Sequence, residues 1–357
     1  IDIVVYGEGE ITLKEILDGH CQNLEKIDGL AFRKKDGQII VNPPRKLIED
    51  LNVLPLPQRQ LSTYQNYSKQ NLYQAIHIRL KKIGLSEKSV LFWSKKISSL
   101  PLLDRAYFYL YNRHNSTRLP VADMITSRGC PNHCTFCAIH NIWGHYWRMR
   151  SAENVLDEID ILVKKYHDKH INFQDDNYSV SKERIIKICK GIVERKYNIT
   201  IIAPSGTFCP SLDEEILTWL KMAGMNEIRL SIESGCQKIL DEVIKKRIDL
   251  SKVKEVVDLC HKLKIETEGV FMFGVPGETV ATMEESLNFA KSVGFDRVVK
   301  FIFQPFPHTE LYDLCIKNNY LTPDYDPRKL YVTGSACYVK TENFSPIDVQ
   351  TIVGRKS

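Results

Sequence analysis

Long hydrophobic runs are missing from this sequence, and so is a strong excess of charge of one sign. No apolar stretch approaches the ~18 residues that a membrane-spanning helix needs, so we expect no membrane span. The formal net charge over 357 residues is only +5, and the basic residues form short runs instead of the stripe typical of nucleic-acid-binding proteins. Nucleic acid is therefore not an expected partner.

A disulfide framework is missing as well. Seven cysteines stand singly along the chain, namely Cys21, Cys189, Cys209, Cys236, Cys260, Cys315 and Cys337. Small secreted domains usually carry paired sets of cysteines instead, and no secretory leader is visible here. We therefore expect a reducing, cytoplasmic location.

The two ends of the sequence resemble cut ends. Residues 1–17, IDIVVYGEGEITLKEIL, predict a strand, a GxG turn and a helix. A dinucleotide fingerprint would need a third glycine where Thr12 stands, and Glu8 and Glu10 would repel a phosphate at the start of the helix. We expect the last βα unit of an α/β domain, within a fragment of a longer protein.

Four regions are expected along the chain. Residues 1–50 read as the remnant of that α/β domain and include a predicted hairpin around Asp36-Gly37. Residues 51–120 read as a linker that is tyrosine-rich and partly helical. A regular domain is expected over residues 121–320, followed at 321–357 by the start of a C-terminal extension.

The regular domain alternates short apolar strands with amphipathic helices. Six strands are predicted, within VADMITS, HINFQDD, NITIIAPS, NEIRLSIES, IETEGVFMFGVPG and FDRVVKFIFQPF, and each is followed by a helical pattern. Continuous apolar strands alternating with helices are typical of a parallel sheet that helices cover. The predicted fold class is α/β, a partial six-unit (βα) TIM-like barrel, whose functional residues should lie at the C-terminal ends of the strands.

The polar and glycine motifs occur where this rule places them. A cysteine motif follows the first strand, Asp175-Asp176-Asn177 the second, SIESG the fourth, GVPGE the fifth and PFPHT the sixth. Since the C-terminal ends of parallel strands meet at one end of a barrel, these motifs are expected to converge on one pocket.

The cysteine motif, CPNHCTFC, contains Cys130, Cys134 and Cys137. Together with His140 these thiolates would make a four-ligand structural zinc site. An iron–sulfur cluster normally takes four thiolates, so three would leave one iron open to a ligand that is not protein. The spacing alone leaves both alternatives open, and the strand-end position favours the cluster.

C-x3-C-x2-C with Phe136 before the last cysteine resembles the radical S-adenosylmethionine superfamily, over about residues 121–320. The resemblance implies a 4Fe–4S cluster on the three cysteines, with S-adenosylmethionine on the fourth iron. It also implies reductive cleavage to a 5′-deoxyadenosyl radical, which abstracts hydrogen from a substrate, and an electron donor such as flavodoxin or ferredoxin.

Further roles are implied by the same resemblance. The matching positions that would contact S-adenosylmethionine are Phe136, Asp175, Asp176, Asn177, Ser231, Glu233, Gly269, Gly274 and Glu278. Asp175 to Asn177 have the simpler alternative of capping a helix, and Gly277 that of turning the chain. A basic residue common after strand three is replaced by Phe208 and Cys209. Lys245, Lys246, Arg148 or Arg150 are candidates to replace it.

The sequence most resembles one branch of the superfamily, the cobalamin-binding radical enzymes of the anaerobic magnesium-protoporphyrin ester cyclase-like and methyltransferase-like kind. The segments similar to that branch are VVYGEGE, SRGCPNHCTFC, WRMRS, FQDDNYSV, SIESG, FMFGVPGET and PFPHTELY. The resemblance implies cobalamin and the methylation, cyclisation or rearrangement of a small or medium metabolite. The alternatives are a methylthiotransferase acting on tRNA or protein, and a zinc-stabilised binding module. Cys21 is the only cysteine in residues 1–120, which argues against the second cluster of a methylthiotransferase.

Overall fold

The structure is a computed structural model that describes residues 2–59, 86, 88–90, 92–93, 122–331 and 336–355. Most of the expected linker lies outside the described residues. No helix among the described residues is long and apolar enough to cross a membrane.

Two parallel three-stranded sheets form the main domain. One contains β4 (Ala122–Met124), β7 (His170–Phe173) and β8 (Thr200–Ile202), and the other contains β9 (Glu227–Glu233), β10 (Glu266–Phe273) and β11 (Arg297–Ile302). Each strand pairs in parallel with its neighbour in chain order. A parallel bridge between Thr207 and Leu230 joins the two sheets. The six predicted strands and the α/β fold class are therefore confirmed.

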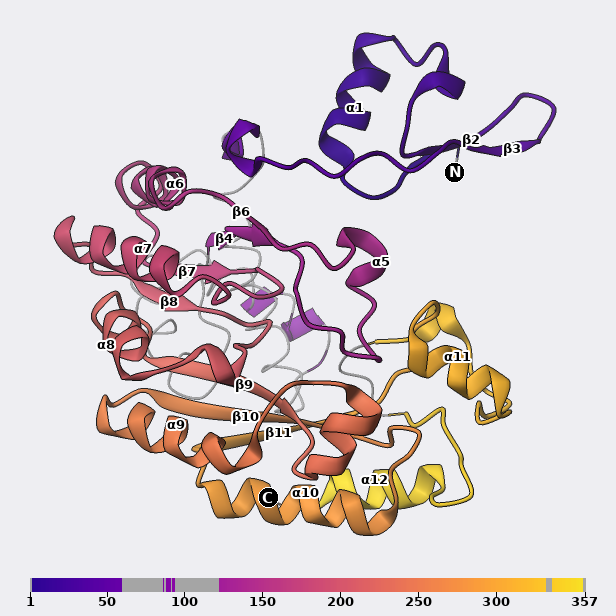
Figure 1. Ribbon diagram of the computed structural model, residues 1–357. Coiled ribbons are helices and arrows are strands. Elements are labelled where there is room, and N and C mark those ends of the chain that lie inside the picture. The colour runs from indigo at the N-terminus through magenta and orange to yellow at the C-terminus, as the bar shows by residue number, and fades with distance from the viewer. Residues whose placement is uncertain are drawn as a thin grey trace.

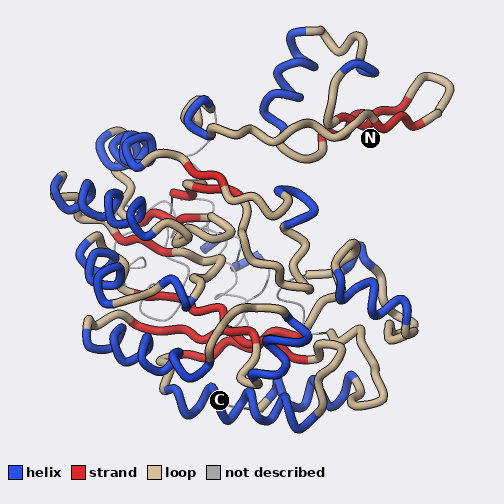
Figure 2. Tube along the Cα trace, in the orientation of Figure 1, coloured by secondary structure: helices blue, strands red, loops and turns tan. Residues whose placement is uncertain are grey.

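Helices cover the outer face of these sheets (Figures 1 and 2). They are α6 (Ala152–Lys164), α7 (Lys182–Glu194), α8 (Glu214–Met222), α9 (Leu250–Lys262) and α10 (Val280–Val293), while α11 (Glu310–Lys317) lies at the side of the domain. The residue before each helix is Ser, Asp or Thr, and its side chain accepts a backbone N–H of the first turn. Such N-caps satisfy donors that a helix cannot satisfy by itself, so these side chains fix where the helices begin.

The alternation of side chains along β9 separates the core from the site. Ile228, Leu230 and Ile232 are buried in the main hydrophobic core. Successive side chains of a strand point to opposite faces, so Ser231 and Glu233 point away from that core. Burying a branched aliphatic side chain contributes about 2 kcal/mol, which fixes the register of this strand.

A small antiparallel ribbon encloses the cysteine motif. It pairs β5 (Ser127–Arg128) with β6 (Arg148–Met149), and the chain between them contains the short helix α5 (His140–Trp143). The cysteines therefore lie in a loop that leaves β4 and returns beside it.

The N-terminal residues form a separate small sheet, seen above the main domain in Figure 1. Its strands are β1 (Ile3–Val5), β2 (Leu30–Arg33) and β3 (Ile39–Val41), and the helical segments nearby are α1 (Gly9–Asp18), η1 (Leu24–Lys26) and η2 (Leu51–Val53). β2 and β3 pair in an antiparallel hairpin, as the Asp36-Gly37 turn predicted. Gly37 has a φ of +91°, a conformation that favours glycine.

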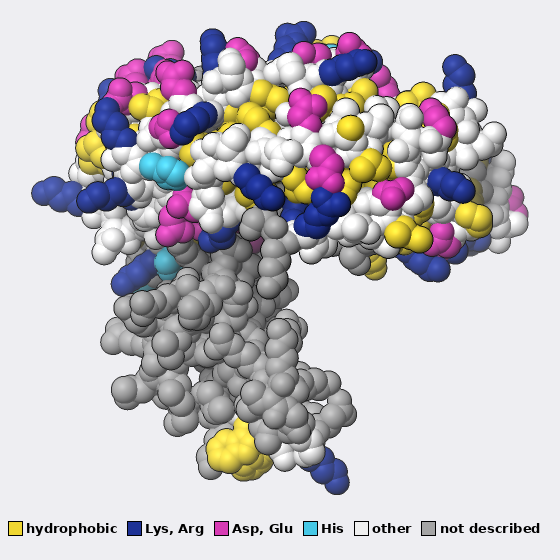
Figure 3. Space-filling model, turned by 90° about the horizontal axis from the view of Figure 1, so that it is seen from below, with side chains coloured by type: hydrophobic (Ala, Val, Ile, Leu, Met, Phe, Trp, Pro, Cys, Tyr) yellow, Lys and Arg dark blue, Asp and Glu magenta, His cyan; other side chains and the backbone are white. Residues whose placement is uncertain are grey.

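The C-terminal residues pack on the same main domain. The elements there are η6 (Pro327–Lys329) and α12 (Pro346–Gly354), and α12 lies against β11 and α10. In the face shown in Figure 3, basic and acidic side chains of the described residues are intermingled, so this face has no stripe of one charge.

Candidate active site

A cavity of about 250 Å³ lies at the C-terminal ends of β7, β8 and β9, and we call it the cysteine cavity. Its lining residues are Cys130, Asn132, Cys134, Phe136, Cys137, Ile139, Asp176, Asn177, Ser205, Gly206, Thr207, Phe208, Ser231, Glu233 and Lys246. All three cysteines of the motif thus face one cavity, at the end of the strands where the barrel rule places function.

Two aspartates after β7 fix the chain that leads into the cysteine motif. Asp175 accepts bonds from the Thr126 N–H at 2.7 Å and from the Thr126 and Ser127 hydroxyls at 2.5 Å each. Asp176 accepts the N–H of Gly129 at 2.9 Å. Gly129 itself has a φ of +82°, and a Cβ there would lie 2.1 Å from the carbonyl oxygen of Tyr146. The approach to Cys130 is therefore held by bonds that a larger residue at position 129 would break.

Thr135 fixes the middle of the motif. Its N–H donates to the Ile244 carbonyl at 3.1 Å, and its hydroxyl donates to the Val243 carbonyl at 2.7 Å. Its carbonyl accepts the N–H of Leu311 at 3.1 Å. Ile244 and Val243 belong to η5 (Ile239–Ile244), a π-helix, and Leu311 belongs to α11. The residue after Cys134 is thus held between two helices.

The cysteine thiols are poorly solvated. Burial raises the pKa of Cys134 to about 12 and also raises the pKa of Cys137. The amide of Asn177 lies 3.8 Å from the sulfur of Cys130, within reach of a weak N–H···S bond. Thiols with a raised pKa are protonated at neutral pH, so a metal must displace their protons to bind.

A buried cation faces these thiols. The ammonium of Lys246, a residue only 6% exposed, lies 2.8 Å from a carboxylate oxygen of Glu233. Burial lowers the pKa of Lys246, but the neighbouring Glu233 and Cys134 outweigh this effect and raise it. Lys246 therefore stays charged, and it is well placed to offset negative charge on sulfur or on a carboxylate ligand.

The other basic candidates lie elsewhere. Lys245 pairs with Glu310 at 2.6 Å, Arg148 with Glu8 at 2.8 Å and Arg150 with Glu158 at 2.5 Å. None of these three lines the cysteine cavity. Of the four candidate replacements for the missing basic residue, Lys246 is the one that faces it.

Five of the nine predicted cofactor contacts line the cysteine cavity: Phe136, Asp176, Asn177, Ser231 and Glu233. Glu233 has a φ of +73°, a conformation unusual for a residue with a side chain. The side chain of this residue forms the ion pair with Lys246. Strained backbone conformations are common at functional sites, where the surrounding contacts impose them.

The remaining four predicted contacts do not line the cavity. The carboxylate of Asp175 is taken up by Thr126 and Ser127. A Cβ on Gly269 would lie 2.8 Å from the Phe295 ring, and one on Gly274 would lie 3.0 Å from Val349. Glu278 accepts the N–H groups of Gly274 and Val275 at 2.8 Å each. In this structure these residues support the site from outside it.

One functional position was missed. Gly206 lines the cavity with a φ of +97°, and a Cβ there would lie 2.1 Å from the Ser231 hydroxyl oxygen. Its positive φ favours glycine, and a side chain there would displace the Ser231 hydroxyl. The signal available was a glycine directly after a predicted apolar strand.

The donor set suits an iron–sulfur cluster in kind. It offers three thiolates and one amide donor to sulfur, and both features are used by protein-bound clusters. No three His, Cys, Asp or Glu side chains among the described residues converge on a single point as ligands of one metal ion. His140, the fourth ligand of the zinc alternative, does not line the cavity, and its ring stacks on His145 with centroids 4.0 Å apart.

The family model described as the radical SAM superfamily matches residues 124–290. An uncharacterized methyltransferase of Pyrococcus horikoshii is 29% identical over 90% of this chain and 59% of its own length. The cytidylyl-2-hydroxyethylphosphonate methyltransferase of Streptomyces wedmorensis is 25% identical over 91% of this chain and 58% of its own. The chain thus spans less than two thirds of the length of these relatives.

A solved structure shares the fold. The radical S-adenosylmethionine methyltransferase TsrM of Kitasatospora setae matches with a TM-score of 0.65 at 16% identity, over 91% of this chain and 57% of its own. The segment that matches the family model begins at Met124 in β4. It includes all three cysteines and the other residues that line the cysteine cavity. On this evidence residues 124–290 contain a radical SAM domain.

Proposed function

We propose that this chain belongs to a cobalamin-associated radical S-adenosylmethionine enzyme that modifies a small or medium organic metabolite. The observation that carries the proposal is the cysteine cavity, in which three thiols face a buried lysine at the C-terminal ends of the strands. A purely structural metal site would not need a cavity lined by Ser231, Glu233 and Asp176.

Each residue has a place in this proposal. Cys130, Cys134 and Cys137 would bind three irons of a 4Fe–4S cluster and leave the fourth open. Such a cluster, with S-adenosylmethionine on its open iron, would supply the reductive cleavage chemistry that yields methionine and a hydrogen-abstracting 5′-deoxyadenosyl radical. Lys246 would hold the carboxylate of S-adenosylmethionine, because a buried cation favours that charge.

The other cavity residues would orient the same ligand. Asp176 and Glu233 are the carboxylates facing the cavity, and one of them would accept the ammonium group. Ser231 would bond a ribose hydroxyl, and Phe136 would lie beside the adenine. Asn177 would both face the ligand and donate to Cys130.

Cobalamin is proposed from the N-terminal residues and from the relatives. A solved TsrM structure is titled as having cobalamin and a 4Fe–4S cluster bound. In this chain β1 pairs with β2 alone among the described strands, while Val4, Ile39 and Val41 remain exposed. An open edge beside exposed apolar side chains supports our proposal that residues 1–50 are the remnant of a larger α/β domain.

The relatives include methyltransferases and cyclases, so methylation and cyclisation are both supported as outcomes. The proposal further includes an external electron donor such as flavodoxin or ferredoxin and a reducing, cytoplasmic location. The alternatives remain a methylthiotransferase and a zinc-stabilised binding module.

Metal analysis separates the cluster from zinc. After anaerobic reconstitution with iron and sulfide, we expect a brown protein with about four irons per chain. A colourless protein that retains one zinc would overturn the proposal. Four further irons, bound as a second 4Fe–4S cluster, would favour the methylthiotransferase.

A further inference from the structure

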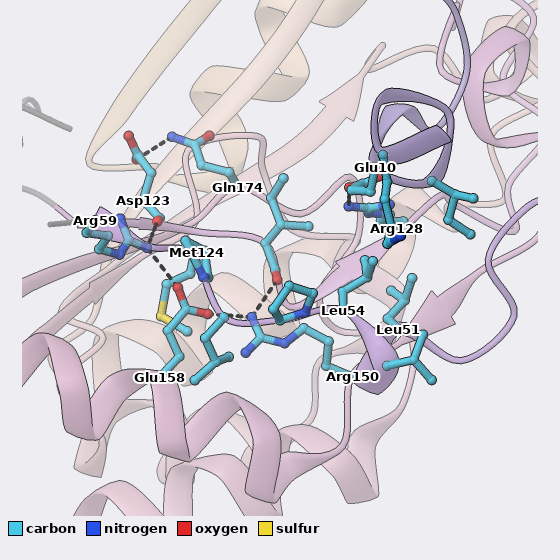
Figure 4. A pocket seen from close by; sticks show the side chains of 17 residues that line it. Glu10, Leu51, Leu54, Arg59, Asp123, Met124, Arg128, Arg150, Glu158 and Gln174 are labelled. Carbon is cyan, nitrogen blue, oxygen red and sulfur yellow. Dashed lines mark hydrogen bonds and ion pairs between the residues drawn. The ribbon is translucent and has the colours of Figure 1, made fainter. Parts of the chain in front are cut away.

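A second and larger cavity, of about 960 Å³, lies between the N-terminal residues and the edge of the main domain (Figure 4). We call it the seam cavity. One wall is made by α1 and by residues from the segment 51–59, and the other by β4 and residues near it, among them Arg128 of β5. Apolar side chains dominate its lining, among them Ile11, Leu51, Leu54, Met124 and Ile125. Cavities of this size at the boundary of two units are common ligand sites.

Each cation that lines the seam cavity is paired with a carboxylate, and two of them share one carboxylate. Glu158 accepts Arg59 at 2.8 Å and Arg150 at 2.5 Å, and it is itself buried. Arg128 pairs with Glu10, as the dashed lines in Figure 4 show. The remaining cation, Lys14, pairs with Asp18. The cavity therefore offers no unpaired cation, among the described residues, to attract an anionic ligand.

Asp123 differs from the other charged groups of the lining. Its oxygen Oδ1 accepts the amides of Asn172 at 3.0 Å and Gln174 at 2.7 Å. Arg59 donates to its backbone carbonyl at 2.7 Å, not to its carboxylate. No described cation forms an ion pair with this carboxylate, so Asp123 presents a negative charge and a free acceptor at the wall of an apolar cavity.

The seam cavity lies next to the cysteine cavity along two chain segments. Arg128 lines the seam cavity, and Cys130, two residues further along the chain, lines the cysteine cavity. In the same way, Gln174 lines the seam cavity and Asp176 lines the cysteine cavity. The segments after β4 and β7 thus contribute to the linings of both cavities.

We propose that the seam cavity binds an organic molecule with an apolar body and an N–H or O–H donor that meets Asp123. The molecule is neutral or cationic, because an anion would face the Asp123 carboxylate at an apolar wall. Resting on the proposed function, its natural occupant is the organic substrate. This places a substrate of low negative charge beside the cavity in which hydrogen abstraction begins.

A matched pair of fluorescent probes tests the proposal on the full chain without iron. N-phenyl-1-naphthylamine is neutral, apolar and carries one N–H, and 8-anilinonaphthalene-1-sulfonate is the same skeleton with an added sulfonate. We expect the neutral probe to bind about tenfold more tightly than the anionic one, since a like charge nearby costs more than 1 kcal/mol in such a site. The variant Asp123→Asn should reduce the ratio of the two probe affinities severalfold.

Filling variants locate the bound probe. Ile125→Trp and Val53→Trp put a large ring into the lining from opposite walls, and each should weaken binding of the neutral probe about tenfold. Ile347→Trp, at an exposed apolar position outside the cavity, should leave binding unchanged. Val53 is 68% exposed, so its replacement should not disturb folding.

The outcomes decide between the parts of the account. Unchanged binding in both filling variants, or equal affinity for both probes in the unaltered chain, would overturn the seam cavity as this site. Neither result depends on the cluster. Loss of probe binding therefore refutes the substrate site without touching the radical chemistry, and a protein that fails to bind iron leaves the probe result standing.

Discussion

At the scale of single residues, Glu278 is a buried carboxyl group with a local structural role. Its oxygen Oε2 accepts two backbone N–H groups at the turn after β10, and its oxygen Oε1 has no partner. Burial raises the pKa of Glu278 to about 8. The folded chain therefore prefers the protonated form, whereas the unfolded chain ionises near pH 4.5.

This difference predicts a pH-dependent effect of Glu278→Gln. Between about pH 4.5 and pH 8 the unaltered chain should lose up to about 1.4 kcal/mol of stability per pH unit that the glutamine variant does not lose. The variant should thus gain in relative stability from pH 5.5 to pH 7.5, as measured by urea unfolding. The same change at exposed Glu183 is the control. A pH-independent difference at position 278 would show that the carboxyl group is already ionised in the folded chain.

Residue identity alone did not show which predicted residues line the cysteine cavity and which lie outside it. Asp175 and Asp176 are adjacent and chemically alike, yet only Asp176 lines the cysteine cavity. Gly269 looked suited to a close ligand approach, but the space it leaves is filled by the Phe295 ring. Side-chain direction at the end of a strand depends on local twist and on partners distant in sequence, which a motif does not encode.

At the scale of elements, the strands and most helices follow from hydrophobic periodicity and N-caps. The segment QKILDEVIKK was expected to form an ordinary helix, but it contains a π-helix, η5. A wider helical turn is common near functional sites. Here the last carbonyls of η5 accept the N–H and the hydroxyl of Thr135, between two of the cysteines.

The role of η5 predicts the behaviour of variants at Thr135. Thr135→Val removes the hydroxyl that donates to Val243, and a lost hydrogen bond of about 1 kcal/mol should let the motif open about fivefold more often. Thr135→Ser keeps the hydroxyl and should behave like the unaltered chain. The measurement is the rate at which iodoacetamide alkylates Cys134 without metal, followed by mass spectrometry. Equal alkylation rates for the valine and serine variants would show that the hydrogen bond from Thr135 to η5 does not hold the motif closed.

At the scale of the whole molecule, one buried ion-pair network joins the N-terminal residues to the cysteine motif. Glu8 accepts Arg128 at 2.7 Å and Arg148 at 2.8 Å, and it also accepts the N–H of Ile48 at 2.6 Å. From sequence, Glu8 was interpreted only as a residue at the start of a helix. Partners 120 and 140 positions away leave no local pattern, so this contact was not predictable.

Removing the charge of Glu8 should loosen the N-terminal residues. Glu8→Gln leaves two buried guanidinium groups with a weaker partner, which should cost about 3 kcal/mol. Glu10→Gln alters an acid that is 42% exposed and should cost less than about 1 kcal/mol. Native-state hydrogen exchange of amides in α1 should therefore accelerate much more in the first variant. Equal protection in both variants would contradict a network centred on Glu8.

The central claim is that the cysteine cavity cleaves S-adenosylmethionine, and its most direct test is a product measurement. Reconstituted protein, reduced anaerobically and given S-adenosylmethionine, should release 5′-deoxyadenosine. Cys134→Ala should abolish this release, and Cys21→Ala, which alters an exposed cysteine outside the motif, should not. If the Cys134 variant still forms 5′-deoxyadenosine, or the unaltered protein forms none, the claim is wrong.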